Sequence, residues 1–103
     1  MKKERVSAAV RLDGYFRRRL RDPKTAAAYL NEAARDNDPA AFLQALREVA
    51  EARGGLGQIA AKAKVNRQQL YKTLSKTGNP ELRTLTAVLA ATGFAFEFRP
   101  AKR

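Results

Sequence analysis

The sequence predicts an all-α domain that ends in one short β-strand. Apolar residues recur at helical spacing through most of the 103 residues. Three Asx-Pro pairs each stand before such a pattern: Asp22-Pro23, Asp38-Pro39 and Asn79-Pro80. In each pair the Asx side chain can cap the first helical turn, and proline suits the first helical position because an N–H there would have no partner. Only the last residues, from 94 onward, alternate between apolar and polar as a strand does.

These signals place helices over five ranges: 23–36, 39–53, 57–64, 67–75 and 80–92. Gly54 and Gly55 end the second of these helices, and Gly93 ends the last. Residues 5–20 can form one more helix, which Gly14 interrupts.

Two of the expected helices carry broad apolar stripes. The stripe of the helix at 39–53 consists of Phe42, Leu43, Leu46, Val49 and Ala50. The stripe of the helix at 80–92 consists of Leu82, Leu85, Val88 and Leu89. A stripe of this kind can line a ligand pocket, but it more often faces the core. We interpret both stripes as core.

Residues 57–74 are typical of a helix-turn-helix. The inward positions of its two short helices are all apolar: Ile59, Ala60, Ala63, Leu70 and Leu74. Val65 fills the turn, and Asn66 stands where the N-cap of the second helix belongs. Four outward side chains can reach DNA: Arg67, Gln68, Tyr71 and Lys72. The motif therefore makes a small basic domain a candidate reader of DNA sequence.

The charge distribution supports the same interpretation. The formal net charge is +11, which favours a polyanionic partner, with nucleic acid ahead of an acidic protein or a membrane surface. Residues 1–24 hold nine cations and three acids, whereas residues 25–52 have a net charge of −3. Residues 53–80 hold six cations and no acid, and they include the helix-turn-helix. Backbone phosphates would be drawn to this stretch and repelled by the one before it.

Several functional classes are excluded by composition. The chain has no cysteine and no histidine, so disulfides, thiolate zinc sites and histidine-based catalysis cannot occur. The ten acids are scattered, and no glycine-rich phosphate loop follows a strand, so we expect no enzyme, no metal and no cofactor. No apolar run approaches the roughly 20 residues of a membrane span, and the N-terminus lacks the apolar segment of a secretory signal. We expect a cytoplasmic protein.

The C-terminal alternation puts Phe94, Phe96 and Phe98 on one face of the expected strand. One strand cannot satisfy its own backbone, and no second strand-like segment is present in the sequence. It must pair with a copy of itself or with another protein, or else not form a strand. We expect a homodimer in which the three phenylalanines pair across the two-fold axis.

Three segments together carry a family resemblance: DPKTAAAYLNEA, DPAAFLQALREVAEARGG and QIAAKAKVNRQQLYKTLSKTGNPELRTLTAVLAATG. The most specific parts are LYKTLSKTGNP and the block that joins Ala52-Arg53-Gly54 to the helix-turn-helix. Through these segments residues 22–99 resemble the addiction-module antidote proteins, small cytoplasmic antitoxins with a lambda-repressor-like (Xre/Cro-type) helix-turn-helix. The resemblance implies a lambda-repressor-like five-helix bundle. It also implies a prokaryotic regulator that represses its own operon and neutralises a toxin of the RelE/HigB type, which cleaves messenger RNA.

The chain departs from the family pattern in three places. Lys64 stands in the turn where glycine is common, so this residue is expected to carry a left-handed backbone penalty. Gly57 opens the first helix of the motif where a Ser or Thr cap is usual. The basic cluster of residues 17–21 exceeds what the resemblance predicts, and it suits a flexible arm on DNA, a soluble helix surface, or contact with RNA or an acidic partner.

Matching Leu70 to the buried position of a recognition helix assigns roles to its neighbours. Base edges would be read by Arg67, Gln68 and Lys72. Arg67 suits guanine O6 and N7, and Gln68 suits adenine N6 and N7. The DNA backbone would be contacted by Asn66, Tyr71, Lys76 and Arg83. Tyr71 could instead touch a thymine methyl group or simply pack.

We therefore expect three regions: a basic arm or helix at 1–21, a helix-turn-helix domain at 22–93, and a strand and tail at 94–103. Two copies would bind a pseudo-palindromic operator in duplex DNA. The acidic helices of residues 25–52 would meet a basic, RNA-cleaving toxin. The alternatives are a stand-alone or phage-type regulator without a toxin, a toxin-binding module with vestigial DNA affinity, and an RNA-binding accessory protein.

Overall fold

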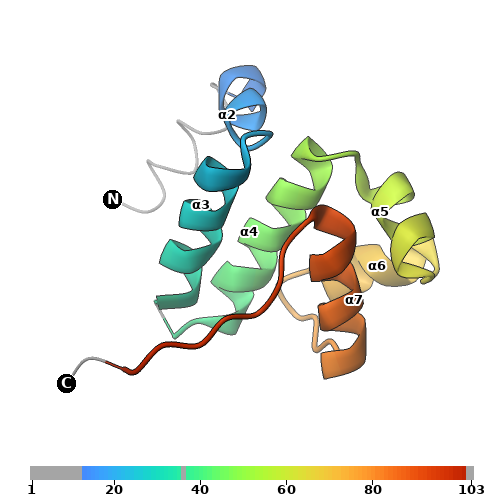
Figure 1. The fold of residues 1–103 in the computed structure, drawn as a ribbon. Helices are drawn as coiled ribbons and strands as arrows, with labels where there is room; N and C mark the ends of the chain where they lie inside the picture. Colours follow the sequence, from blue (N-terminus) through green and yellow to red (C-terminus); the bar gives the residue numbers. More distant parts are fainter. Residues whose placement is uncertain (1–12, 36, 102–103) are drawn as a thin grey trace.

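The computed structural model describes residues 13–35 and 37–101, which form six α-helices and no strand (Figure 1). The helices are α2 (Asp13–Arg19), α3 (Pro23–Arg35), α4 (Pro39–Ala52), α5 (Leu56–Ala63), α6 (Arg67–Thr73) and α7 (Leu82–Thr92). The predicted all-α class and its five main helices are thus confirmed, with ends shifted by one or two residues. Helix α2 occupies the last part of the helix expected over residues 5–20, and the start of that helix lies outside the described residues.

The first two Asx-Pro caps form as predicted. Asp22 accepts hydrogen bonds from the backbone N–H and the hydroxyl of Thr25, both at 2.9 Å. Asp38 accepts from the backbone N–H of Ala40 at 3.1 Å and extends toward that of the next residue. Because each carboxylate replaces a missing helical acceptor, α3 and α4 begin at their prolines.

The third predicted cap is wrong. Helix α7 begins at Leu82, with Glu81 as its N-cap and no side-chain cap bond. The bond from the Leu85 N–H to the Glu81 carbonyl, 2.9 Å long, marks this start. Asn79 and Pro80 therefore belong to the preceding loop rather than to the helix.

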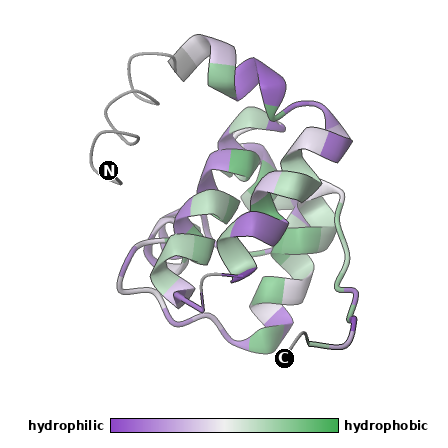
Figure 2. Ribbon diagram, turned by 90° about the vertical axis from the view of Figure 1, so that its left-hand side faces the viewer, coloured by the Kyte–Doolittle hydropathy of each residue, from purple (hydrophilic) through white to green (hydrophobic). Residues whose placement is uncertain are grey.

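The core lies where the helices meet, and α4 contributes more buried residues to it than any other helix. Its fully buried side chains include Leu46, Val49 and Ala50, which confirms the predicted stripe. Hydrophobic residues recur along the central helices (Figure 2), and the buried ones form one cluster. Helix α4 packs on α2 and α3, while α5 packs on α6 and most extensively on α7.

Two side chains expected in the core are less buried than predicted. Leu82 is 70% exposed at the first position of α7. Phe42 is only partly buried at the edge of the core. In α7 the core is formed instead by Val88 and Leu89, with Leu85 packed partly against them.

The expected C-terminal strand is not present. Gly93 ends α7 as predicted, with φ at 99°, and the Phe94 N–H then donates to the Leu89 carbonyl at 2.8 Å. This bond is typical of a Schellman cap, in which the next apolar side chain folds back on the helix. Phe94 accordingly packs on the core, whereas Phe96 and Phe98 are exposed and stack with ring centres 6.3 Å apart.

The predicted shared face of the three phenylalanines is therefore wrong. No other strand lies within the described residues, so the segment from 94 to 101 has no ladder to join and runs on without secondary structure (Figure 1). The helix cap takes the first ring inward, and only the second and third rings point to solvent.

Candidate nucleic-acid interface

Helices α5 and α6 are joined by three residues, 64–66, and their inner sides are buried as expected. Ile59 and Ala60 of α5 meet Leu70 of α6 in the core, and Leu74 is fully buried just after α6. The two remaining apolar positions of the motif, Ala63 and Val65, are partly buried and pack against the same core. This burial holds one side of α6 against the molecule and turns its other side outward.

The turn has the strained backbone that the sequence indicated. Lys64 adopts φ 60° and ψ 43°, in the left-handed region that favours glycine. Its N–H donates to the Ala61 carbonyl at 3.2 Å, and the Val65 N–H donates to the Ala60 carbonyl at 3.0 Å. Lys64 adopts this strained conformation because α5 ends within one residue.

The predicted N-cap of α6 is confirmed, and that of α5 is wrong. The Asn66 side-chain oxygen accepts from the Gln69 N–H at 3.1 Å. Helix α5 starts one residue earlier than expected, with Gly55 at the N-cap in a conformation of φ 89°. Gly57 lies inside α5, where a Cβ would come within 3.7 Å of the Arg67 guanidinium carbon. A small residue there lets the Arg67 side chain lie beside α5.

Arg67, Gln68 and Lys72 are all exposed on α6. Within the described part of the chain their side chains form no hydrogen bond and no ion pair, so none of them is occupied by its own fold. The helix thus presents one guanidinium, one amide and one ammonium to solvent. These groups can donate to base edges or to phosphate oxygens.

Tyr71 is 38% exposed and is tied to α4. The Arg47 guanidinium carbon lies 5.2 Å from the centre of its ring, and Arg47 Nε lies 3.5 Å from a Glu51 carboxylate oxygen. The packing role that the sequence left open for Tyr71 is therefore present. Spacing along the chain could not reveal Arg47 as its partner, because the two residues lie on different helices.

An open concavity of about 710 Å³ runs beside α6 and the loop that follows it. The residues that line it are polar apart from one glycine: Asn66, Gln68, Gln69, Lys72, Thr73, Ser75, Thr77, Gly78 and Asn79. The Gly78 N–H donates to the Ser75 carbonyl at 2.9 Å, which closes a turn within the loop. A Cβ at Gly78 would overlap the carbonyl oxygen of Thr73, so this glycine, which sequence reasoning did not single out, determines the shape of the loop.

The structure brings together only some of the predicted contact residues. Asn66, Gln68 and Lys72 share the concavity, whereas Arg67 lies toward α5. Lys76 is exposed in the loop after α6, and Arg83 is exposed in the first turn of α7. The three phenylalanines of the C-terminal segment take no part in this surface.

The acids before this region are largely occupied within the fold. Glu48 accepts a hydrogen bond from the Tyr29 hydroxyl, and Arg35 lies 2.8 Å from a Glu32 oxygen. Burial and the Glu48 carboxylate raise the pKa of Tyr29 well above its ordinary range. No group of three or more acids in residues 13–35 and 37–101 lies close enough to hold a metal ion. None of the helices formed by those residues is long and apolar enough to cross a membrane.

The comparison with known protein families agrees with the segments that carried the resemblance. A family model described as "Probable addiction module antidote protein" matches residues 15–100. The chain belongs to this family. An uncharacterized protein of Haemophilus influenzae is 38% identical to this chain over 74 residues, which are 72% of this chain and 75% of that protein. No solved structure matches the chain.

One cation of this chain has a role that its position in the sequence concealed. Arg53 was counted with the acid-free basic stretch, but its Nε donates to the Thr92 carbonyl at 2.8 Å and its Nη1 to the Arg21 carbonyl at 2.7 Å. Its guanidinium carbon also lies 5.2 Å from the centre of the Phe94 ring. Arg53 therefore joins the end of α4 to the start of α3 and to the end of α7. The only signal in the sequence was its place in the block Ala52-Arg53-Gly54.

Proposed function

We propose that this antidote protein is the antitoxin of a toxin–antitoxin pair and binds operator DNA through the exposed side of α6, repressing its own operon. The observation that carries the DNA part is the joint exposure of Arg67, Gln68 and Lys72 opposite the buried Leu70. The burial of Leu70 fixes α6 against the core, and this matters because reading bases requires hydrogen-bond donors at fixed positions relative to the duplex.

Each of the three side chains suits a different contact. Arg67 has the planar fork that matches guanine O6 and N7, and Gln68 can bond adenine N6 and N7. Each such bidentate pair supplies roughly 1–3 kcal/mol of discrimination against other bases. Lys72 would add a third contact from the next turn of the helix. Phosphates would be held by Asn66, Tyr71, Lys76 and Arg83, which orient the protein without reading sequence.

The electrostatics of the region favour a duplex. Residues 53–80 contain six cations and no acid, so nothing in this stretch repels phosphate. Binding should therefore weaken steeply as salt rises, because each neutralised phosphate releases a counterion.

We further propose a lambda-repressor-like (Xre/Cro-type) helix-turn-helix that acts as a homodimer on a pseudo-palindrome. Half-sites one turn apart place two recognition helices about 34 Å from each other. The molecule extends 37 × 36 × 26 Å, so two copies side by side can span this distance. The family relationship supports a toxin partner, and the RelE/HigB type is the one we propose.

Selection from a pool of random duplexes tests the DNA part. We expect recovery of a partly symmetric consensus, with Arg67→Ala relaxing the preference at one base pair in each half. The matched control is Lys76→Ala, which should weaken all duplexes alike and lower the salt dependence by about one ion. Recovery of no consensus by the wild-type protein would end the claim of sequence-specific repression.

Co-expression tests the antitoxin part. The product of the adjacent reading frame should arrest growth when expressed alone, and this chain should restore growth and co-purify with that product. If growth stays arrested and no complex is purified, the antitoxin role is refuted and only the proposed DNA-binding role remains.

A further inference from the structure

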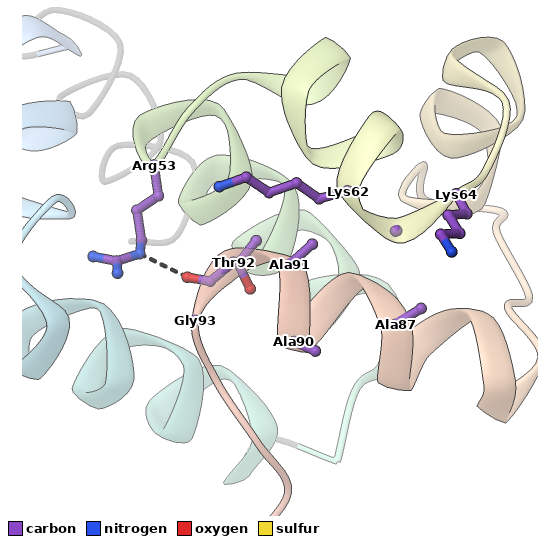
Figure 3. A pocket seen from close by; sticks show the side chains of 9 residues that line it. Arg53, Lys62, Lys64, Ala87, Ala90, Ala91, Thr92 and Gly93 are labelled. Carbon is purple, nitrogen blue, oxygen red and sulfur yellow. Dashed lines mark hydrogen bonds between the residues drawn. The ribbon is translucent and has the colours of Figure 1, made fainter.

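A second concavity, of about 730 Å³, lies between α5 and α7 (Figure 3). We call it the basic groove, and it is lined by Arg53, Lys62, Ala63, Lys64, Ala87, Ala90, Ala91, Thr92 and Gly93. Three of these residues are cations and none is an acid. The groove shares no lining residue with the concavity beside α6, so the two surfaces are distinct.

Among the described residues that line the basic groove, the two lysines have no acidic side chain to neutralise their charge. Lys62 extends from α5 along the groove toward Arg53, while Lys64 lies at the other end, near Ala87 (Figure 3). In the parts of the chain that the structure describes, neither lysine forms an ion pair or a hydrogen bond. Like charges around one concave surface repel each other, and an anionic group seated between them would relieve that repulsion.

Arg53 gives the groove a rigid charged end. Its hydrogen bonds to the carbonyls of Thr92 and Arg21 use Nε and Nη1, while Nη2 lies beside Gly93, where a Cβ would come within 3.1 Å of it. Because the guanidinium is already held in place, an incoming carboxylate would not have to order it.

The floor of the groove favours a protein segment over a phosphate backbone. Ala87, Ala90 and Ala91 present methyl groups, and Gly93 presents only backbone. No bulky side chain rises from α7 here, so a partner main chain can approach closely and cover apolar surface. A nucleic-acid backbone would contact the cations but leave the methyl groups uncovered.

We propose that the basic groove is the docking site for an acidic segment of a partner protein. Carboxylates of that segment bind Arg53, Lys62 and Lys64, and its small or apolar side chains pack on the alanines of α7. This proposal depends on the proposed function, because it takes the toxin as the partner that docks here. It adds that the contacting segment of that partner is acidic. Since the surface is distinct from the α6 face, DNA and partner can be bound together.

The first experiment locates binding on the full-length chain by ¹⁵N–¹H NMR. The probe is a 16-residue alanine-rich helical peptide with glutamate at every fourth position, and the same peptide with glutamine is the control. We expect the glutamate peptide alone to shift the amide signals of α5 and of residues 87–93. Absence of shifts at millimolar peptide, or shifts centred on α2 or α6, would overturn the proposal.

The second experiment separates the groove from overall charge. The double variant Lys62→Glu, Lys64→Glu should weaken peptide affinity at least tenfold. Its matched control is Lys24→Glu, Arg99→Glu, which makes the same change of charge at exposed positions outside the groove and should alter affinity less than twofold. Equal loss in both double variants would show attraction by the net charge alone and would overturn the proposal.

A third variant and a competitor complete the test. Ala90→Trp fills the groove at an exposed position without changing charge, and it should also weaken the peptide tenfold. A 20-base-pair duplex should not displace the peptide, and displacement would assign the groove to nucleic acid instead. The double variant in the groove should still select the wild-type DNA consensus. Peptide binding thus tests the docking site, and DNA selection separately tests sequence recognition by α6.

Discussion

The guanidinium carbon of Arg47 lies 5.2 Å from the centre of the Tyr71 ring and connects α4 to the outward side of α6. Glu51 lies one turn further along α4, 3.5 Å from Arg47 Nε, and orients the guanidinium. The proposed recognition helix is therefore held by a surface contact in addition to the buried Leu70. This arrangement makes the position of α6 sensitive to a residue that need not touch DNA.

Replacing Tyr71 tests that contact. Tyr71→Ala removes the ring, and we expect the free energy of unfolding to fall by about 1 kcal/mol. Tyr71→Phe keeps the ring and should leave stability unchanged, so any loss of DNA affinity in this variant reports the hydroxyl. Urea unfolding and DNA titration on both variants measure the two effects. Equal destabilisation by Ala and Phe would show that the ring has no part in holding α6.

Asn66 combines a cap with a proposed phosphate contact. Asn66→Ala removes the acceptor for the Gln69 N–H and should lower the free energy of unfolding by about 1 kcal/mol. Asn66→Ser retains a capping oxygen but loses the amide donor, so its stability should stay near wild type while DNA binding weakens. Chemical denaturation and binding titration separate these outcomes. If Asn66→Ser binds DNA as tightly as the wild type, Asn66 does not contact the DNA backbone.

Arg53 should matter more for stability than any other cation of the region. Arg53→Lys keeps the charge but cannot satisfy the carbonyls of Thr92 and Arg21 together, and we expect a loss of about 2 kcal/mol. Lys62→Arg, a conservative change at an exposed position of α5, is the control and should be neutral. Thermal and urea unfolding measure both. A neutral Arg53→Lys would mean that these hydrogen bonds contribute nothing to the fold.

Lys64 is strained, and glycine should relieve the strain. Lys64→Gly accommodates φ 60° without the side-chain clash, so the free energy of unfolding should rise by about 1 kcal/mol. The same change removes one cation of the basic groove, so affinity for the glutamate peptide should fall. Greater stability with weaker peptide binding is the expected pair of results. Lower stability would contradict the left-handed assignment.

Tyr29 should produce an alkaline loss of stability. Its pKa in the folded protein is raised above the ordinary value of 10.0, because burial and Glu48 disfavour the tyrosinate. Above about pH 10 the unfolded chain releases this proton while the folded protein retains it, so the free energy of unfolding falls as pH rises. Tyr29→Phe lacks the group and should lose less stability than wild type between pH 9 and pH 11. Urea titrations at the two pH values make the comparison.

Local patterns were sufficient for the helices and for the side of α6 that faces the core. The caps of Asp22 and Asp38, the stop at Gly93 and the strained Lys64 all depend on groups within a few residues of each other. Such interactions can be read from spacing. The same patterns failed for Asn79, where the loop closed by Gly78 delays the start of α7.

Long-range partners could not be predicted in this way. Phe94 has the alternation of a strand residue, yet its ring packs on the core because the cap of α7 turns it inward. Leu82 fits the helical stripe of α7 and is still 70% exposed to solvent. In both cases the spacing of apolar residues indicates the type of secondary structure, but it does not indicate which other helices lie next to the side chain.

The amino-acid order alone determined the helical class, the burial of Leu70 and the outward position of Arg67, Gln68 and Lys72, because helical geometry assigns residues to sides of a helix without reference to the rest of the chain. Tertiary structure alone decided that Arg53 meets Thr92 and that Lys62 shares a groove with it. These pairs connect the residue that follows α4 with the end of α7 and with α5, and no spacing along the chain encodes which helices will touch.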